Sequence, residues 1–440
     1  MDHLESISPV DGRYRSKCED LSSYFSESGL IRYRLKIEIE YLIKISQHLG
    51  FNHLIDEIKL RDICSNYKFN ITEAKKIKEI EKVTNHDVKA IEYYLRKRHE
   101  IPKEICKWVH YGLTSQDINT SANMLQIKEA WVMVQWTELQ NLQNQLTELQ
   151  TSFKNIPMLS RTHGQPASPT TLGKELAVFI ERISYAISME QQTPWSSKFG
   201  GAVGNFNSLV LAHPELNWNL IADDLMTDLG LTRSTFTTQI DHYDHLAAHF
   251  DNYKRINTIL IDLCRDIWTY ISMDYFKLAV IKDEVGSSAM PHKVNPIDFE
   301  NAEGNLGIAN SLFEFFSRKL PISRLQRDLT DSTVLRNVGV AFSHTLIAIK
   351  SIMKGLSKLE VNKEKIARDL RENWVVVVEG VQILLKREGI DDAYEKVKEL
   401  TRGEVNVEAL FKWIEELEVS DSVKTQIKTL NPESYIGNVW

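Results

Sequence analysis

The stretch GSSAMPHKVNP occupies residues 286–296 and follows a long segment, residues 231–285, that contains neither glycine nor proline. Such a segment can form one uninterrupted helix. Gly286, Pro291 and Pro296 would end that helix, because glycine favours irregular backbone and proline lacks a backbone donor. The sequence therefore predicts a long helical segment followed by an irregular loop. The polar side chains of this loop are Ser287, Ser288, His292, Lys293 and Asn295.

The loop combines groups that can exchange a proton with groups that can hold an anion. Its hydroxyl and imidazole groups belong to the first class, and its ammonium and amide groups can bind a carboxylate. The alternative interpretation is a polar surface connector without chemistry, which is the usual role of a short polar loop. The rest of the chain has to decide between the two.

Apolar residues recur at helical spacing along most of the chain. Leu139, Leu142 and Leu146 show this spacing in one segment, and Ile256 and Leu260 show it in the segment before the loop. Segments of this length favour an elongated antiparallel bundle, so the predicted fold class is all-α. Apolar residues on more than one face of a long helix also indicate oligomerisation. The expected helical segments are approximately 30–49, 71–98, 113–156, 172–187, 231–285, 299–320 and 333–354.

Chain length predicts two or three domains, because 440 residues exceed the size of one typical domain. Pro102 breaks the first helical region, and after Gly355 the expected helices become shorter and the charge density rises. We therefore expect an N-terminal helical domain (1–110), a central bundle of long helices (111–354) and a C-terminal helical domain (355–440). The expected C-terminal helices cover 361–372, 374–388, 391–401 and 406–418.

The charge pattern excludes a general nucleic-acid-binding or membrane-binding surface. The net charge is −7, and acidic and basic residues are interleaved along the chain. The 4 cysteines lie far apart without a CxxC pair, which is typical of a reduced cytoplasmic protein. The N-terminal sequence MDHLESISPV lacks the basic start and apolar core of a secretory signal, and no apolar stretch is long enough to span a bilayer. We expect a cytoplasmic protein without a membrane or nucleic-acid partner.

Four further stretches place histidine, hydroxyl and amide side chains where helices begin or end. They are TNHDVKA (84–90), HYGLTSQD (110–117), RTHGQPA (161–167) and RDLTDSTVLRN (327–337). We interpret Ser115 as an N-cap, since a helix start also leaves backbone N–H groups that can bind an anion. Each stretch has a plain structural interpretation as well, as a surface histidine, a helix cap or a solvated arginine.

Three further histidines have the spacing of one helix face. His242, His245 and His249 are separated by three and four residues. Because the chain supplies no matching cluster of metal ligands beside them, we interpret them as a solvated stripe and expect no metal site.

Together these stretches resemble the adenylosuccinate lyase family of the fumarase/aspartase superfamily, whose members release fumarate by β-elimination. SPVDGRY (8–14) and TTQI (237–240) join the stretches quoted above in the order and approximate spacing of bacterial adenylosuccinate lyases, and the resemblance covers nearly the whole chain. Within the superfamily, His292 in MPHKVNP, the stretch TNHDVKA and the pair Arg13 and Tyr14 favour this family over fumarases, aspartases and argininosuccinate lyases.

The resemblance implies an all-α, three-domain fold of the fumarase/aspartase type. It also implies a homotetramer in which each active site takes residues from three subunits. The implied activity is that of a carbon–nitrogen lyase of purine nucleotide biosynthesis, which cleaves adenylosuccinate to AMP and fumarate, and SAICAR to AICAR and fumarate. No cofactor is implied, because proton transfers and an electrostatic sink are sufficient.

Two alternatives remain open. One is another fumarate-releasing lyase, such as argininosuccinate lyase. The other is a catalytically inactive helical scaffold relative. Inactive relatives typically lose a catalytic residue, whereas Ser287, His163 and Lys293 are all present.

The resemblance also assigns roles to residues. His163 is the implied general acid and Ser287 the implied general base, although a serine hydroxyl needs neighbours that stabilise its alkoxide. Lys293 and Asn295 would hold the carboxylate whose charge rises in the carbanion. The succinyl carboxylates would be bound by Thr114, Ser115, Gln239 and Ser288 with help from His86, the nucleotide by Arg13, Tyr14, Arg327, Ser332 and Arg336, and Asn85, Asp87 and Asn301 would complete the pocket.

Overall fold

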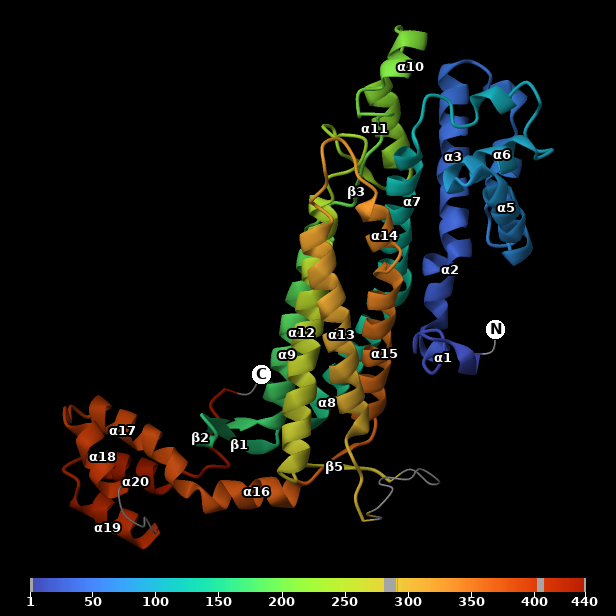
Figure 1. Ribbon diagram of the computed structural model, residues 1–440. Coiled ribbons are helices and arrows are strands. Elements are labelled where there is room, and N and C mark those ends of the chain that lie inside the picture. The colour runs from blue at the N-terminus through green and yellow to red at the C-terminus, as the bar shows by residue number, and fades with distance from the viewer. Residues whose placement is uncertain (1–2, 281–289, 291, 402–406, 439–440) are drawn as a thin grey trace. The chain divides into compact units, whose positions relative to one another are not determined.

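Helices form nearly all of the regular structure in the computed structural model (Figure 1). The structure describes residues 3–280, 290, 292–401 and 407–438. The α-helices are α1 (Arg15–Cys18), α2 (Ser22–Phe25), α3 (Glu27–His48), α4 (Glu57–Ile63), α5 (Ile71–Thr84), α6 (Asp87–Arg96), α7 (Ser115–Ala130), α8 (Trp136–Phe153), α9 (Leu172–Gln192), α10 (Asn207–Ala212), α11 (Trp218–Asp228), α12 (Asp244–Ser272), α13 (Ile297–Lys319), α14 (Thr330–Leu335), α15 (Val338–Leu356), α16 (Lys363–Glu372), α17 (Val378–Arg387), α18 (Ala393–Thr401), α19 (Val407–Glu416) and α20 (Asp421–Lys428).

Shorter elements complete the described chain. The 3-10 segments are η1 (His3–Glu5), η2 (Glu19–Leu21), η3 (Asn52–Leu54), η4 (Cys106–Trp108) and η6 (Trp374–Val377), and a π-helical segment, η5 (Trp131–Gln135), links α7 to α8. The strands are β1 (Pro157–Thr162), β2 (Gln165–Thr171), β3 (Ser196–Ser197), β4 (Thr232–Arg233), β5 (Phe276–Leu278) and β6 (Leu359–Val361). They pair as β1–β2, β3–β4 and β5–β6.

Packing divides the chain into two compact units, and each unit is built from three separate segments of sequence. Unit 1 comprises Met1–Asn141, Ser184–Asp262 and Glu300–Ile352, and unit 2 comprises Leu142–Ile183, Leu263–Phe299 and Met353–Trp440. The expected domain limits at residues 110 and 354 stay predictions.

The N-terminal part of unit 1 is organised around α3, which packs against α5, α6 and α7 (Figure 1). The helix begins where the Ser26 side chain accepts a hydrogen bond from the Gly29 backbone N–H. Leu35 and Ile37 point to opposite sides of α3, yet both are fully buried. A helix with buried side chains on opposite sides is enclosed by its neighbours, and this enclosure explains why α3 has the central place.

Aromatic side chains from three long helices form the core of the bundle part of unit 1. The ring centroid of Phe313 on α13 lies 5.7 Å from that of Phe250 on α12 and 5.9 Å from that of Phe342 on α15. Tyr253 on α12 lies 5.3 Å from Phe342. Stacked and edge-to-face aromatic contacts of this kind bury large apolar areas. They confirm the prediction that the long central segments pack as a helical bundle.

Unit 2 contains a β-hairpin that the sequence analysis did not predict. β1 and β2 pair antiparallel with Thr162 opposite Gln165, so His163 and Gly164 form the turn between them. Their φ angles are 52° and 75°. Positive φ at both central residues is the backbone condition for a tight hairpin turn that matches the twist of the strands.

The C-terminal helices of unit 2 have an apolar core of their own. Val381 and Leu385 on α17, Ala393 on α18, Ile414 on α19 and Ile427 on α20 are buried in one cluster. Helices as short as these are marginal in isolation, so burial of one apolar face in a shared cluster supplies most of their stability. The sequence analysis predicted short helices here but missed α20.

Within the described residues 231–280, the expected helix is correct only in its middle, because α12 spans Asp244–Ser272, and residues 281–285 of the expectation lie outside the described residues. Before α12, Asp241 accepts hydrogen bonds from the Ser234 hydroxyl at 2.7 Å and the Tyr243 backbone N–H at 3.0 Å, and Tyr243 has a φ of 59°. Such side-chain bonds hold the backbone in a non-helical turn. After α12, β5 pairs with β6. The absence of glycine and proline therefore did not suffice to predict a helix.

Other helical expectations are confirmed with adjusted ends. The segments 30–49, 172–187 and 299–320 correspond to α3, α9 and α13. The expected helix over 71–98 is divided, because Asn85 adopts a left-handed conformation after α5 and His86 caps α6. No helix in the described part of the chain is long and apolar enough to cross a membrane.

The interpretation of His242, His245 and His249 as a solvated stripe is wrong for His249. This side chain is fully buried, its Nδ1 lies 2.6 Å from Glu190 Oε1, and its ring stacks on Trp195 with centroids 3.8 Å apart. The helix face that carries His249 packs inside unit 1, which spacing along the sequence could not reveal.

Candidate active site

The residues predicted to form the site fall into both units. His163, Lys293 and Asn295 belong to unit 2, and the predicted Ser287 and Ser288 lie outside the described residues. The remaining predicted residues belong to unit 1 and are Arg13, Tyr14, Asn85, His86, Asp87, Thr114, Ser115, Gln239, Asn301, Arg327, Ser332 and Arg336.

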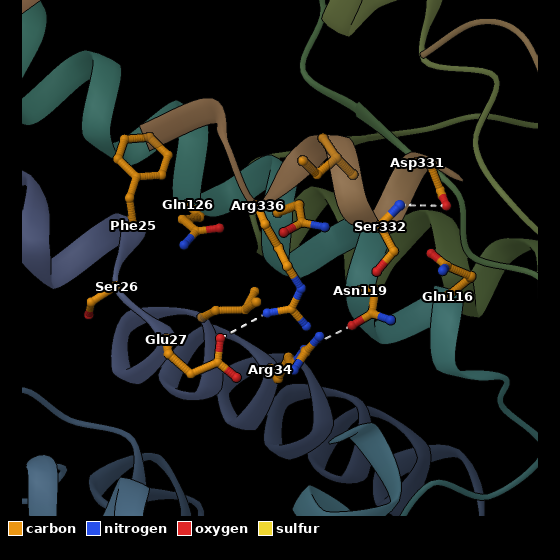
Figure 2. A pocket seen from close by; sticks show the side chains of 13 residues that line it. Phe25, Ser26, Glu27, Arg34, Gln116, Asn119, Gln126, Asp331, Ser332 and Arg336 are labelled. Carbon is orange, nitrogen blue, oxygen red and sulfur yellow. Dashed lines mark hydrogen bonds and ion pairs between the residues drawn. The ribbon is translucent and has the colours of Figure 1, made fainter. Parts of the chain in front are cut away.

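Two arginines from distant parts of the sequence meet at one carboxylate in unit 1. Asp87, the first residue of α6, accepts a hydrogen bond from Arg34 Nη2 at 2.6 Å, and its Oδ2 lies 3.5 Å from Arg336 Nη2. Arg34 projects from α3, whereas Arg336 directly follows α14. Figure 2 shows the two guanidinium groups turned toward one another across the pocket. The Asp87–Arg336 contact thus joins the TNHDVKA and RDLTDSTVLRN stretches, and Arg34, which the sequence analysis missed, holds the same carboxylate.

A second carboxylate, which the sequence analysis also missed, binds the other terminal nitrogen of Arg336. Glu27 Oε2 accepts from Arg336 Nη1 at 2.9 Å (Figure 2), and Glu27 Oε1 accepts from Lys78 Nζ at 3.0 Å. Glu27 lies in the first turn of α3 after the cap Ser26, where a negative charge is favourable. Ser26 followed by Glu27 signals a helix start in the sequence, but nothing local reveals the partner of Glu27.

A cavity of about 310 Å³ opens beside these groups. Its wall includes Ser332 and Arg336, which are predicted nucleotide ligands, together with Arg34 and Asn119 (Figure 2). Arg34 is only 3% exposed, and its Nε donates to Asn119 Oδ1 at 2.8 Å. A buried, immobilised guanidinium beside a second arginine suits an anion such as a phosphate.

Both carboxylates of this cluster are ionised at neutral pH. Burial opposes ionisation of Asp87, but the Arg34 charge, a backbone hydrogen bond and Arg336 together hold its pKa below the usual range. Burial also opposes ionisation of Glu27, and its pKa is nevertheless lowered by the hydrogen bond from Lys78 and the charge of Arg336. A phosphate that binds Arg336 must therefore share it with two negative groups.

The start of α7 brings three further predicted residues together. Thr114 is the N-cap and Ser115 the first helical residue, which corrects the interpretation of Ser115 as the cap. The Asp117 side chain accepts from the Thr114 backbone N–H at 2.8 Å, as in a capping box. This bond fixes the turn, and Ser115 Oγ then lies 3.5 Å from His86 Nε2.

Gln239 is held by backbone groups. Its Nε2 donates to Ala202 O at 3.0 Å, and its backbone N–H donates to Gln326 O at 3.2 Å, beside Arg327. Ala202 belongs to the loop 198–206, which the sequence analysis did not consider. The available signal was its composition, KFGGAVGNF, because closely spaced glycines permit a tight approach of backbones.

Arg327 lies among polar side chains of unit 1. The Gln116 amide oxygen accepts from its guanidinium, and Arg327 Nη1 lies 4.0 Å from Asp331 Oδ2. Asp331 also accepts from the Tyr243 hydroxyl at 2.9 Å. These contacts tie Arg327 to the start of α7 and to α14, so two of the predicted stretches meet here as well.

The remaining predicted nucleotide ligands also form contacts. Asn301 Nδ2 donates to the Tyr14 hydroxyl at 3.0 Å, and Asn301 Oδ1 accepts from Ser351 Oγ at 3.0 Å. The Arg13 guanidinium lies 5.9 Å from the centroid of the Tyr14 ring. The structure thereby joins the N-terminal stretch to α13 and α15, and it adds Ser351, which the sequence analysis missed.

The predicted residues of unit 2 have exposed or half-buried side chains. His163 is exposed at the turn of the β1–β2 hairpin. Lys293 is exposed, its backbone N–H donates to Met290 O at 3.0 Å, and Asn295 is half-buried just before α13. An exposed imidazole can act as an acid or base, and an exposed ammonium can bind a carboxylate.

Unit 1 by itself offers paired arginines, hydroxyl groups and a helix start, which suit anions. Unit 2 by itself offers an exposed imidazole and an exposed ammonium. In the described residues, no group of three or more His, Cys, Asp or Glu side chains is arranged to hold a metal ion.

Comparison with known proteins assigns the chain to a family. Residues 12–309 match the family model described as "Lyase", and residues 323–436 match the model described as "Adenylosuccinate lyase C-terminal". The chain is 50% identical to the adenylosuccinate lyase of Dictyostelium discoideum over 455 aligned residues, which cover 99% of this chain and 97% of that protein. It is 43% identical to the adenylosuccinate lyase of Escherichia coli strain K12 over 442 residues, with the same coverage.

Solved structures share the fold at low sequence identity. A fumarate lyase from Mesorhizobium sp. BNC1 superposes with a TM-score of 0.72 at 18% identity, covering 95% of each chain. The β-carboxy-cis,cis-muconate cycloisomerase of Acinetobacter calcoaceticus sp. ADP1 superposes with a TM-score of 0.70 at 19% identity, covering 97% of each chain. These likenesses support the all-α fold, and the two family models with the near-full-length identities show that the chain belongs to the adenylosuccinate lyase family of the fumarase/aspartase superfamily.

Proposed function

We propose that the protein is a carbon–nitrogen lyase that cleaves adenylosuccinate to AMP and fumarate, and SAICAR to AICAR and fumarate, in purine nucleotide biosynthesis. The observation that carries this proposal is the identity of 50% to an adenylosuccinate lyase along 99% of the chain. The cavity beside Arg336 and Ser332 supports it, because a nucleotide monophosphate needs a site for a dianionic phosphate.

The reaction requires a base, an acid and a sink for negative charge. We assign the base to Ser287, which would remove the proton from the carbon next to a carboxylate. His163 would protonate the departing nitrogen, and Lys293 and Asn295 would stabilise the carboxylate as its charge rises. His163 has the exposure that this role needs, since a proton donor has to reach the substrate.

The substrate's two ends would be held by different parts of unit 1. Thr114 and Ser115 at the start of α7 and the fixed side chain of Gln239 would bind the succinyl carboxylates. Ser288 and His86 would add to the carboxylate contacts. The nucleotide would be held by Arg13, Tyr14, Arg327, Ser332 and Arg336, with Arg336 and Ser332 at the phosphate, and Asn85, Asp87 and Asn301 would complete the pocket. Substrates are small nucleotides, and the proposal invokes neither a cofactor nor a nucleic acid.

We also propose a cytoplasmic homotetramer with shared active sites. Tyr185 on α9 and Ile308 and Phe315 on α13 are exposed on unit 1, and apolar side chains on long helices favour a subunit interface. None of the 4 cysteines, all of which lie in the described residues, forms a disulfide, which suits a reducing compartment.

A substrate panel tests the reaction. Purified protein should release fumarate from adenylosuccinate and from SAICAR in amounts equal to the AMP and AICAR formed. Argininosuccinate should give none. Fumarate from argininosuccinate alone would favour the related lyase, and no turnover of any of the three would favour an inactive scaffold.

Mixing of inactive variants tests the shared sites. Ser287→Ala and His163→Gln proteins should regain activity when their subunits exchange, because some hybrid sites then combine an unmutated Ser287 with an unmutated His163. Exchange confirmed by native mass spectrometry without any gain in activity would show that both residues come from one chain.

A further inference from the structure

We propose that the buried pair Asp117–Lys198 is a positioning device for the substrate. It would fix the relative placement of two segments that carry the proposed ligands of the succinyl carboxylates: Thr114 with Ser115, and Gln239. The inference rests on the proposed function. Neither Asp117 nor Lys198 touches the substrate in this scheme, since each acts through the backbone that it holds.

Asp117 is the centre of the device. It is fully buried, and its Oδ1 accepts hydrogen bonds from Lys198 Nζ at 2.6 Å and from the backbone N–H groups of Gly200 and Gly201 at 2.8 and 3.1 Å. Its Oδ2 accepts from the Thr114 backbone N–H at 2.8 Å. One carboxylate therefore ties the start of α7 to the glycine-rich loop, and charge-assisted bonds of this kind are stronger than neutral ones.

Lys198 is the loop residue that pairs with Asp117. Its side chain is fully buried, and Nζ also donates to Gly201 O at 2.5 Å. Gly201 has a φ of 75°, which suits glycine, and a Cβ placed there would lie 3.5 Å from Gly112 O. The loop backbone thus packs directly on the turn that precedes Thr114.

The same loop reaches the second substrate segment. Ala202, the residue after Gly201, accepts the hydrogen bond from Gln239 Nε2 at 3.0 Å. Two residues further on, Gly204 lies so close to Thr237 that a Cβ at position 204 would be 2.5 Å from Thr237 O. A continuous set of contacts therefore runs from the start of α7 through the buried pair to Gln239.

Stability alone does not account for a charged pair at this place. Removing two charges from water is unfavourable, and an apolar pair of similar size is often equally stable or more stable. Asp117 lies in the first turn of α7, where an unbalanced negative charge would repel a substrate carboxylate. Lys198 balances that charge and leaves the helix start favourable to an anion, while Asp117 still supplies the acceptors that the backbone needs.

Two variants test the contributions of Lys198 and Asp117 separately. Lys198→Met removes the bonds from Nζ to Asp117 and Gly201 while the backbone bonds to Asp117 remain. In Asp117→Asn, the amide oxygen can keep the hydrogen bonds from Lys198 and the loop backbone. The amide NH2 group then faces the Thr114 backbone N–H, so a donor replaces the acceptor that this N–H needs. Glu190→Gln is the matched control, because Glu190 forms a buried pair with His249 at 2.6 Å in the same unit.

The measurements are the binding of AMP alone and of fumarate in the presence of saturating AMP, by titration calorimetry, together with kcat and KM for adenylosuccinate. We expect Lys198→Met and Asp117→Asn to weaken fumarate binding by roughly tenfold or more, since small misplacements of binding groups have large effects. AMP affinity should stay within about twofold of the unmutated value, and both variants should raise KM. Glu190→Gln should lower Tm and leave both affinities unchanged.

Unchanged fumarate affinity in folded Lys198→Met and Asp117→Asn proteins would overturn the inference, and so would equal losses of AMP and fumarate affinity. Should a single variant not fold, the double variant Lys198→Met/Asp117→Asn removes both charges, and it is expected to fold and to bind fumarate weakly. Fumarate affinity at the unmutated level in that double variant would also overturn the inference. Failure of the unmutated protein to cleave adenylosuccinate would instead refute the proposed function.

Discussion

Replacement of Arg336 by alanine tests the proposed phosphate contact. The side chain is 44% exposed and donates to Glu27 at 2.9 Å, so loss of this pair should change the free energy of unfolding by only about 0.2–1 kcal/mol. A hydrogen bond to a charged group contributes roughly 1.5–3 kcal/mol, and each 1.4 kcal/mol corresponds to about tenfold in affinity. We therefore expect KM for adenylosuccinate to rise by roughly 10- to 150-fold.

Steady-state kinetics and AMP binding provide the measurement. Because a phosphate contact acts on the ground state and the transition state alike, kcat should change little while KM and the Kd of AMP rise together. Arg324→Ala is the matched control, since Arg324 lies in the same part of the chain, is 78% exposed and pairs only locally with Asp328 in the described contacts. That variant should have unmutated KM and kcat.

Two outcomes would refute the reasoning about Arg336. A large loss of kcat at unchanged KM would place this residue in the chemical step instead of in binding. A tighter binding of AMP would show that the pairing with Glu27 and Asp87 leaves no capacity for a phosphate. Circular dichroism of Arg336→Ala would establish that the variant is folded.

Three other predictions concern catalysis, pH and packing. His163→Gln should lower kcat by roughly two to four orders of magnitude with substrate binding retained, and near-normal turnover would remove His163 from the mechanism. Burial alone would lower the pKa of His110, but the Glu38 carboxylate 2.6 Å away outweighs it, so the pKa is raised. Protonated His110 therefore stabilises the folded state fully below the ordinary pKa of 6.5. This stability is lost as pH rises through the raised pKa. Tm of the unmutated protein should accordingly fall more between about pH 6 and pH 8 than Tm of His110→Gln, and equal slopes would contradict this. Gly339→Ala should lower the free energy of unfolding by about 1–3 kcal/mol in a denaturant titration, because the added Cβ would overlap with Phe25, and an unchanged midpoint would contradict it.

Local signals in the sequence predicted much of the architecture. Periodic apolar residues identified α3, α9 and α13, because the same periodicity buries one or more helix faces in the structure. The turn at RTHGQPA was also predictable, since Gly164 followed closely by Pro166 disfavours a helix there. The absence of glycine and proline wrongly predicted a helix over residues 231–243. There, Asp241 accepts hydrogen bonds from the Ser234 hydroxyl and the Tyr243 backbone, and these bonds replace helical ones.

The sequence by itself determined the family, because short stretches such as GSSAMPHKVNP and TNHDVKA occur in a fixed order, and the site residues that these stretches carry stay predictions. Only the tertiary structure decided which groups meet. Arg34, Asp87 and Arg336 become neighbours because α3, α6 and the end of α14 pack together, and no local pattern encodes an ion pair between such distant positions. The buried Asp117–Lys198 pair has the same origin: a charge can stay inside a protein only where packing supplies its partner, and packing is a property of the whole fold.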